Sequence, residues 1–178
     1  MEYILFLLYF ITSITIVVIF LNWLSQWLFG YEVPFIRSSN KNIEVLLKNL
    51  KLKSWYNFLD LWSWDGKVLE AISNKFNDVN IHWIENSFFP YLLSQKNKKL
   101  KKLNYIIYKN DFFDEDFSKY NVIYSYTIPY LMDKIWKKVK SECREWTLFY
   151  SNSFCIKWEK EFKKIKIKED TFLYIYKV

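Results

Sequence analysis

The sequence predicts an α/β domain built on a doubly wound, mostly parallel sheet and preceded by one transmembrane helix. Three observations lead to this fold class. Residues 3–21 contain no charged side chain. Beyond them, short apolar runs alternate with segments of helical periodicity, which is typical of parallel α/β sheets. The last two apolar runs have no helix between them, which predicts a closing antiparallel hairpin.

The composition narrows the class of protein. The 178 residues are 52% hydrophobic and carry a formal net charge of +7, which excludes a disordered chain and leaves room for one domain of ordinary size. Two cysteines, Cys143 and Cys155, and a single histidine, His82, exclude a disulfide framework and a Cys/His zinc site. We therefore expect free thiols in a reducing compartment and no metal.

Residues 1–31 are expected to be a retained membrane anchor. A helix over residues 3–21 would span roughly 28 Å, close to the hydrocarbon core of a bilayer. A signal peptide needs a basic start and a small-residue cleavage site, which this segment lacks, and a buried core helix seldom lacks any charged face. Basic residues follow the segment from Arg37 onward, so the positive-inside rule places the domain of residues 32–178 on the cytoplasmic side of the cell membrane.

The elements of that domain follow from local patterns. Apolar residues recur at helical spacing in four segments, as at Leu46 and Leu50 in the first and at Leu69 and Ile72 in the second. Pro90 falls in the first turn of the third helix, where proline is tolerated. In chain order we expect a helix at 43–52, a strand at 56–61, a helix at 67–76, a strand at 79–84, a helix at 87–103, strands at 105–108 and 122–124, a helix at 131–140, and strands at 147–150, 162–167 and 172–178.

Lysines cluster at residues 96–102 and again at 157–168. Attraction to an anionic lipid leaflet beside the anchor is the simplest functional interpretation. A nucleic-acid patch is a second interpretation, and a solvated helix face without a partner is a third. We expect the lipid surface, rather than nucleic acid, to be the partner.

Acidic residues stand at the ends of the first three predicted strands. Asp60 ends the first, Glu85 ends the second and Asp111 follows the third. Ligands of a doubly wound sheet bind outside the carboxyl ends of its strands. A carboxylate at the tip of the second strand suits two ribose hydroxyls, and an aspartate after the third suits the exocyclic amine of a purine. The pattern therefore indicates a nucleoside-containing ligand.

These segments resemble class I S-adenosylmethionine-dependent methyltransferases. Residues 58–66 are similar to that family's first motif, Asp-Leu-Gly-x-Gly-x-Gly, with Trp62 and Trp64 at two glycine positions and Gly66 at the third. This spacing differs from the Gly-x-Gly-x-x-Gly of dinucleotide oxidoreductases. The resemblance implies a Rossmann-like seven-stranded sheet of order 3-2-1-4-5 plus the terminal hairpin, and S-adenosyl-L-methionine as cofactor. The cofactor-binding positions that it implies are Asp60, Trp62, Trp64, Gly66, Glu85 and Asp111.

The anchor and residues 33–39 resemble a narrower group, small methyltransferases with one membrane helix that are related to the mitochondrial enzymes methylating a lysine of the ATP synthase c subunit. This resemblance implies N-methylation of a protein lysine. Ser125 and Tyr126, after the fourth predicted strand, are the substrate-side catalytic candidates. The alternatives are an inactive methyltransferase-fold module that binds a partner at the membrane, and a methyltransferase for a lipid or small molecule. The oligomeric state is not predicted.

The glycine content is unusual. The chain has two Gly and nine Trp, whereas about 12 Gly are expected in an average protein of this length. Trp62, Trp64, Trp83 and Trp146 all stand where the resembled family often has glycine. Genuine indoles at the first two positions would fill the cofactor pocket and inactivate the fold. Our hypothesis is instead that most Trp positions are glycine in the cell, because some bacterial lineages decode UGA as glycine.

Overall fold

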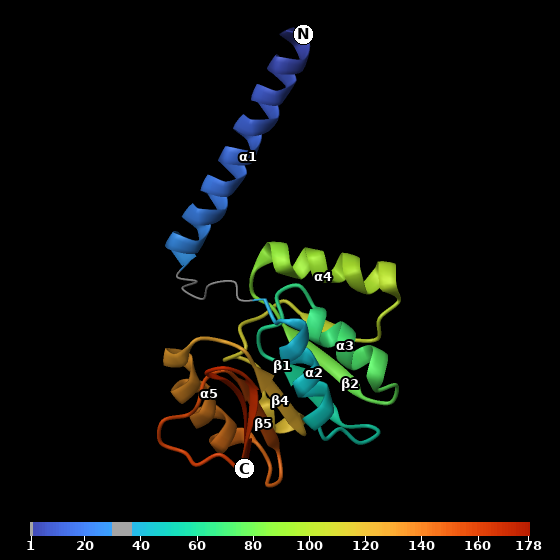
Figure 1. Cartoon of the computed structure of the whole chain (residues 1–178), viewed down its shortest axis with the longest axis vertical. Helices are drawn as coiled ribbons and strands as arrows, with labels where there is room; N and C mark the ends of the chain where they lie inside the picture. Colours follow the sequence, from blue (N-terminus) through green and yellow to red (C-terminus); the bar gives the residue numbers. More distant parts are fainter. Residues whose placement is uncertain (1, 30–36) are drawn as a thin grey trace. The chain divides into compact units, whose positions relative to one another are not determined.

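The computed structural model describes residues 2–29 and 37–178, which belong to two separate compact units (Figure 1). The units are bounded as Met1–Pro34 and Phe35–Val178. The domain boundary predicted between residues 31 and 32 lies outside the described residues, as does most of the segment 33–39 that resembles the narrower methyltransferase group.

The first unit is a single helix, α1 (Glu2–Phe29), which is longer than the expected 3–21. Its segment Tyr3–Leu24 has a mean hydropathy of 2.8 and is not buried in the protein, so by length and composition it could cross a membrane. The hydroxyls of Thr12 and Thr15 donate to the carbonyls of Tyr9 and Ile11, both at 2.8 Å. These polar side chains are thus satisfied within the helix, as a lipid environment requires.

The second unit is built on one seven-stranded sheet of order β3-β2-β1-β4-β5-β7-β6. The strands β1 to β5 are parallel to their neighbours, and β7 is antiparallel to both β5 and β6. This arrangement confirms the predicted strand order and the terminal hairpin. The strands are β1 (Asn57–Asp60), β2 (Asn80–Ile84), β3 (Ile106–Tyr108), β4 (Val122–Ser125), β5 (Leu148–Asn152), β6 (Lys163–Lys168) and β7 (Thr171–Lys177).

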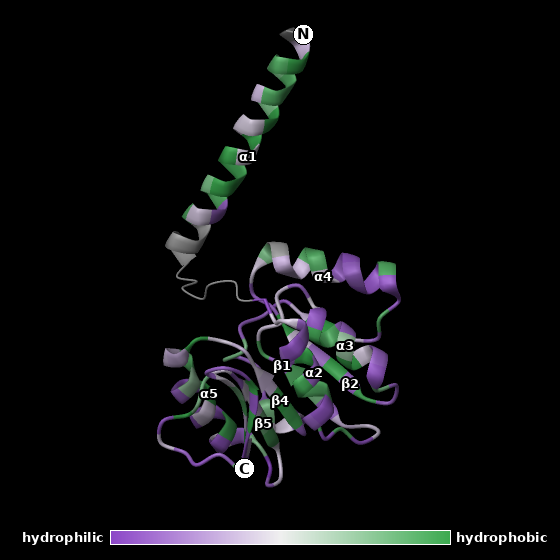
Figure 2. Ribbon diagram, viewed as in Figure 1, coloured by the Kyte–Doolittle hydropathy of each residue, from purple (hydrophilic) through white to green (hydrophobic). Residues whose placement is uncertain are grey.

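Helices cover the two faces of this sheet (Figure 1). They are α2 (Asn40–Asn49), α3 (Lys67–Lys75), α4 (Phe88–Lys101), the 3-10 turn η1 (Phe117–Lys119) and α5 (Pro129–Glu142). One core forms where α2 and α3 bury Leu46, Leu69 and Ile72 against the strands. On the opposite face, the Trp136 ring of α5 contacts the rings of Phe149 and Tyr176 at 5.9 and 5.3 Å. The central strands β1 and β4 bury hydrophobic residues between these layers (Figure 2), whereas the edge strand β6 has lysine at four of its six positions.

Two helices begin two or three residues earlier than expected, and the other helix ends of the domain lie within three residues of the expected ones. The helix expected at 43–52 begins at Asn40, because the Ser39 side chain caps it by accepting the Asn42 N–H at 3.2 Å. The helix expected at 131–140 begins at Pro129, which occupies its first turn. Capping residues carry no apolar periodicity, so the hydrophobic pattern alone starts both helices too late.

Candidate functional site

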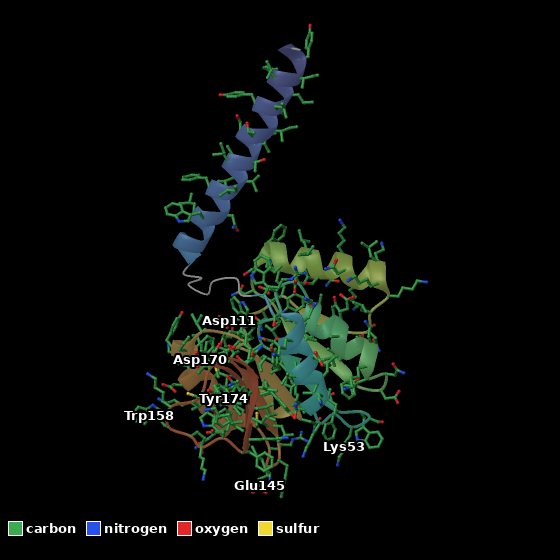
Figure 3. The ribbon with its side chains drawn as sticks, in the orientation of Figure 1. Lys53, Asp111, Glu145, Trp158, Asp170 and Tyr174 are labelled. Atoms are coloured by element: carbon green, nitrogen blue, oxygen red, sulfur yellow. The ribbon has the colours of Figure 1, made fainter. Side chains whose placement is uncertain are left out.

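The acidic side chains predicted for the site lie at one edge of the sheet. β1, β2 and β3 are parallel neighbours, so their carboxyl ends meet there. The Glu85 N–H donates to the Tyr108 carbonyl at 2.9 Å, which places the end of β2 beside the end of β3 and the following Asp111. Figure 3 shows Asp111 at the opposite end of the domain from Lys53 and Glu145, which precede β1 and β5.

Asp60 is fully buried at the end of β1. Its Oδ1 accepts the Trp62 N–H at 3.0 Å, while its buried Oδ2 has no hydrogen-bond partner among the described residues. Burial, with a smaller contribution from the negative charge of Glu85, raises the pKa of Asp60 to about 7. A buried carboxylate oxygen without a partner is costly, and this cost would be relieved by a ligand that donates a hydrogen bond.

Glu85 has the same arrangement at the end of β2. Its side chain is 2% exposed, and its Oε1 accepts the Ser87 N–H at 2.8 Å. Its Oε2 is buried and finds no partner within residues 2–29 and 37–178. Burial raises the pKa of Glu85 to about 7. The two neighbouring strands therefore each present one satisfied and one unsatisfied carboxylate oxygen.

The turn between β1 and α3 connects these acids to the helix. The Leu61 N–H donates to the Tyr124 carbonyl at 3.0 Å, which ties the turn to β4. Gly66 caps α3 with a φ of 73°, a left-handed conformation that glycine adopts without strain. Trp64, two residues earlier, has a φ of 52°. A tryptophan in this region is strained, since its Cβ crowds the backbone.

The tryptophans at the glycine positions share this kind of conflict with their surroundings. Trp146 has a φ of 76°, and it stands at a position where the resembled family often has glycine. Trp55 has a φ of 58°, although the sequence analysis did not assign it to a glycine position. Trp62 and Trp83 each have a buried indole N–H that lacks an acceptor in the described part of the chain. Buried polar groups are normally paired, so these indoles fit their sites poorly.

Trp136 behaves differently from these five residues. It lies within α5, is 6% exposed and packs in the aromatic cluster of that face. Its indole N–H donates to Glu159 Oε2 at 3.0 Å. Trp136 is therefore accommodated by its surroundings. The other five tryptophans stand where the backbone conformation or the burial of the indole favours a smaller residue such as glycine.

The remaining predicted site residues lie at the same edge. Asp111 is half-buried and accepts the Phe113 N–H at 2.9 Å, which closes a turn after β3. Ser125, at the end of β4, is fully buried and shares a hydrogen bond of 3.2 Å with the Thr127 hydroxyl. The ring of Tyr126 is half-buried, 6.5 Å from that of Phe154.

Two polar contacts beside the site were not predicted from the sequence. Arg37 forms an ion pair with Asp65 in the turn, with Nε and Oδ2 at 2.7 Å. Behind β4, Asn152 donates to the Tyr124 hydroxyl at 3.0 Å and accepts from Asn42 Nδ2 at 3.3 Å. The partners in this buried chain are far apart in sequence, so no local pattern could have indicated them.

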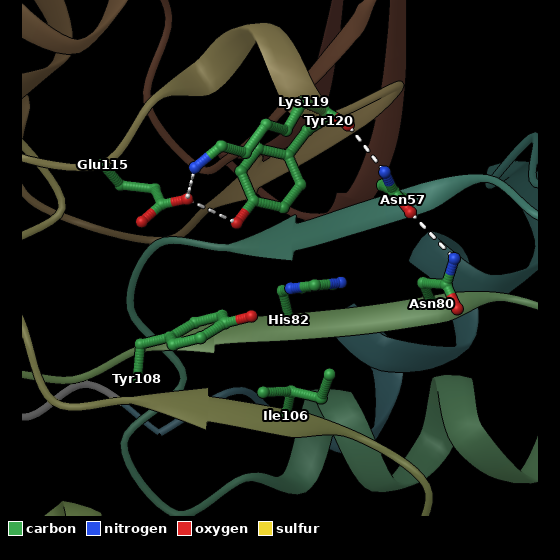
Figure 4. Close-up of a pocket in the computed structure, with 8 residues that line it drawn as sticks. All are labelled: Asn57, Asn80, His82, Ile106, Tyr108, Glu115, Lys119 and Tyr120. Atoms are coloured by element: carbon green, nitrogen blue, oxygen red, sulfur yellow. Dashed lines mark hydrogen bonds and ion pairs between the residues drawn. The ribbon is translucent and has the colours of Figure 1, made fainter.

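A separate hollow of about 450 Å³ lies on the face of the sheet where β2 and β3 carry His82 and Tyr108 (Figure 4). The two rings stack at 5.7 Å, and the Tyr120 ring meets His82 edge-on at 5.4 Å. Burial lowers the pKa of His82. Asn57 and Asn80 of its lining begin β1 and β2, so the hollow extends away from the acidic edge.

Comparison with known proteins gives similarity in structure but not in sequence. No family model matches the chain, and no curated protein matches it. An RNA methyltransferase from Salinibacter ruber, solved in complex with S-adenosyl-L-homocysteine, superposes with a TM-score of 0.73 at 17% identity, covering 80% of this chain and 94% of that one. The ribosomal protein L11 methylase from Lactobacillus delbrueckii subsp. bulgaricus gives 0.66 at 13% identity, covering 80% of each chain. A putative methyltransferase from Escherichia coli gives 0.62 at 14% identity, covering 82% and 89%.

Proposed function

We propose that this chain is an S-adenosylmethionine-dependent methyltransferase that acts at a membrane on a protein lysine. The observation that carries the proposal is the pair of buried carboxylates, Asp60 and Glu85, each with one unsatisfied oxygen at the carboxyl edge of the sheet. Structural neighbours of the same fold include a methyltransferase complexed with S-adenosyl-L-homocysteine, which supports this choice of ligand. The finer assignment of a lysine acceptor rests on the sequence resemblance.

The hydrogen-bond acceptors of the site suit S-adenosylmethionine. Glu85 Oε2 is a free acceptor for a ribose hydroxyl, and Asp111 follows the neighbouring strand β3, where the acceptor for the purine amine is expected. Asp60 holds the turn by accepting the Trp62 N–H. When bound, the cofactor supplies a methyl group on a sulfonium, and in-line transfer needs chiefly correct positioning of the acceptor.

The acceptor side is assigned to the loop that follows β4. An amine attacks only as the free base, so hydroxyls near the methyl must orient it and accept its hydrogen bond. Ser125 and Thr127 already share a hydrogen bond there, and Tyr126 adds a third hydroxyl in the same loop. Thr127 was not among the sequence-based candidates and joins them through this contact.

The proposal requires glycine at positions 62 and 64 in the active protein. The left-handed φ of Trp64 and the unpaired indole of Trp62 support this requirement. The coding DNA tests it directly. We expect UGA at codons 55, 62, 64, 83 and 146 and UGG at codon 136, whose tryptophan is well packed. UGG at codons 62 and 64 would refute the recoding and would favour the inactive membrane-associated module instead.

Cofactor binding is tested with residues 37–178 in two forms, the printed sequence and the variant Trp62→Gly/Trp64→Gly. Calorimetric titration should detect S-adenosylmethionine binding only by the glycine form, because two indoles occupy the space in which the ligand approaches the backbone. In the glycine form, Glu85→Ala should weaken binding by about 1.5–3 kcal/mol through loss of a charge-assisted acceptor. Tight binding by the printed sequence would contradict the steric argument.

The acceptor is tested with the full-length glycine form in membranes and labelled cofactor. We expect label in a membrane protein, released as methyl-lysine on hydrolysis. Label in extracted lipid would instead establish the lipid methyltransferase. Tyr126→Phe is expected to lower the rate of transfer without changing cofactor affinity.

A further inference from the structure

The outer side of α4 is an unusual surface for a water-soluble protein. Leu92, Leu93 and Leu100 are 46%, 41% and 69% exposed there. Lys96 and Lys99 are exposed on the same helix, and Lys102 caps its C-terminal end. Figure 2 shows hydrophobic and hydrophilic residues side by side along this helix, which lies at the outside of the domain.

A lysine-lined hollow adjoins the C-terminal half of α4. It has a volume of about 640 Å³, and its lining consists of Lys96, Lys98, Lys99 and Lys102 with Gln95 and Leu103. No acidic side chain belongs to this lining. The neighbouring Lys101, which is not part of the lining, forms an ion pair with Glu70, with Nζ and Oε2 at 2.6 Å. A cluster of this kind attracts phosphate groups.

The inner side of α4 packs directly on the turn of the candidate site. Ser94 Oγ donates to the Trp64 carbonyl at 3.3 Å, and Asn97 Nδ2 donates to the Asp65 carbonyl at 3.4 Å. The helix begins three residues after Glu85, with Ser87 as its cap. One helix, about 10 Å across, therefore separates the candidate cofactor site from the leucine and lysine surface.

We propose that the outer face of α4 is a docking surface for an anionic lipid bilayer, with its leucines entering the headgroup region and its lysines contacting lipid phosphates. Exposed apolar side chains beside lysines match the two requirements of interfacial binding. Seven residues, 30–36, connect α1 to the described part of the domain, so a membrane-spanning α1 would keep the domain close to a lipid surface. Docking then places the methyl-transfer site close to acceptors at the membrane surface.

Vesicle co-sedimentation of residues 37–178, a compact unit of its own, tests the surface. The domain should bind vesicles of phosphatidylcholine mixed with phosphatidylglycerol, and not phosphatidylcholine alone. Lys96→Gln/Lys99→Gln/Lys102→Gln should lower the partition coefficient at least about tenfold, because each lysine near the surface contributes roughly fivefold. The matched control Lys163→Gln/Lys166→Gln/Lys168→Gln removes the same charge from exposed positions of β6 and should change binding little.

A variant of the exposed leucines distinguishes binding to a bilayer from binding to other polyanions, which offer no apolar interior. Leu93→Ser/Leu100→Ser should also lower vesicle binding about tenfold, while exchanging the three α4 lysines for arginine should preserve it. Equal losses from the α4 and β6 lysine variants, or unchanged binding by the leucine variant, would overturn the proposal. So would binding of an RNA oligonucleotide that depends on the same lysines while vesicle binding does not.

This inference extends the membrane location in the proposed function, but the assay contains neither cofactor nor acceptor. A glycine form (Trp62→Gly/Trp64→Gly) of the domain that docks on vesicles and binds no S-adenosylmethionine would refute the methyltransferase and leave the docking surface intact. A domain that binds the cofactor but binds both vesicle types equally would refute the docking surface and leave the methyltransferase intact.

Discussion

Individual residues of the site are held in states that an isolated peptide would not favour. Asp60 and Glu85 retain protons near neutral pH because both are buried, and Trp64 adopts a left-handed backbone next to them. Buried unpaired carboxylates and backbone strain both destabilise a fold, and they persist at binding sites where a bound ligand offsets the cost. Strain at a single position is also removed when a smaller residue stands there. Here the carboxylates indicate a hydrogen-bond donor ligand, and the tryptophan indicates glycine.

The strain at Trp55 can be measured outside the site. Its side chain is 78% exposed and its φ is 58°, so Trp55→Gly should remove backbone strain with little loss of packing. We expect the free energy of unfolding of residues 37–178 to rise by about 1 kcal/mol in chemical denaturation. Trp136→Gly is the control, expected to destabilise by about 3–5 kcal/mol because that indole is packed in the core. Destabilisation by Trp55→Gly would show that the indole is favourable where it stands.

Glu85 should make the stability of the empty domain depend on pH. Its pKa rises from 4.5 to about 7 on folding, so its protonated form stabilises the fold. That contribution is complete below about pH 4 and is lost as the pH rises through 7. Glu85→Gln should therefore be more stable than the parent at pH 8, by on the order of 2 kcal/mol, and nearly equal to it at pH 4.

Thermal unfolding at several pH values measures this difference. The control Asn104→Ala changes an exposed, uncharged side chain and should leave the pH profile unchanged. A stability gain from Glu85→Gln that is the same at pH 4 and pH 8 would contradict the assigned protonation.

At the scale of the elements, helices and strands around the site are joined by polar contacts as well as by the hydrophobic core. Asn152 of β5 links Tyr124 of β4 to Asn42 of α2, and the Tyr150 hydroxyl donates to the Asn49 carbonyl at 3.2 Å. These bonds fix the start and the end of α2 against the sheet. The helix thereby holds the chain that enters the site with Arg37.

Removing the Asn152 amide tests this link. Asn152→Ala removes the hydrogen bond that the buried Tyr124 hydroxyl accepts and the one that the buried Asn42 amide donates, and should lower the free energy of unfolding by about 1–3 kcal/mol. Asn104→Ala, at an exposed position, serves as the control and should change stability by no more than about 0.5 kcal/mol. Denaturant titration of both variants gives the comparison, and equal effects would exclude a role for the network.

At the scale of the whole molecule, the chain combines an apolar helix with an independent α/β domain. The helix has the length and hydropathy of a membrane span, and the proposed function uses it as an anchor. The docking proposal makes the outer face of α4, with its leucines and lysines, a second contact with the lipid. Two linked contacts together bind more tightly than either alone.

Membrane extraction tests the anchor. The full chain should remain in the pellet after alkaline carbonate washing, because α1 would be inserted across the hydrocarbon core. Residues 37–178 should be released by the same wash, since lipid docking through lysines is weakened by salt and high pH. Release of the full chain would contradict a spanning helix and would leave α4 as the membrane contact to be tested.

The sequence by itself determined the class of the fold, the strand order and the edge at which Asp60, Glu85 and Asp111 meet. The fold class depends on hydrophobic periodicity and the shared edge on the rule that parallel strands end together, and both can be read locally. The strand order came from the family resemblance, which also singled out four of the misfitting tryptophans at positions where the family often has glycine. Only the tertiary structure decided the protonation of the two acids, the left-handed φ of Trp55, the network at Asn152 and the outer face of α4. Each of these depends on burial or on contact between distant segments, which local periodicity does not encode.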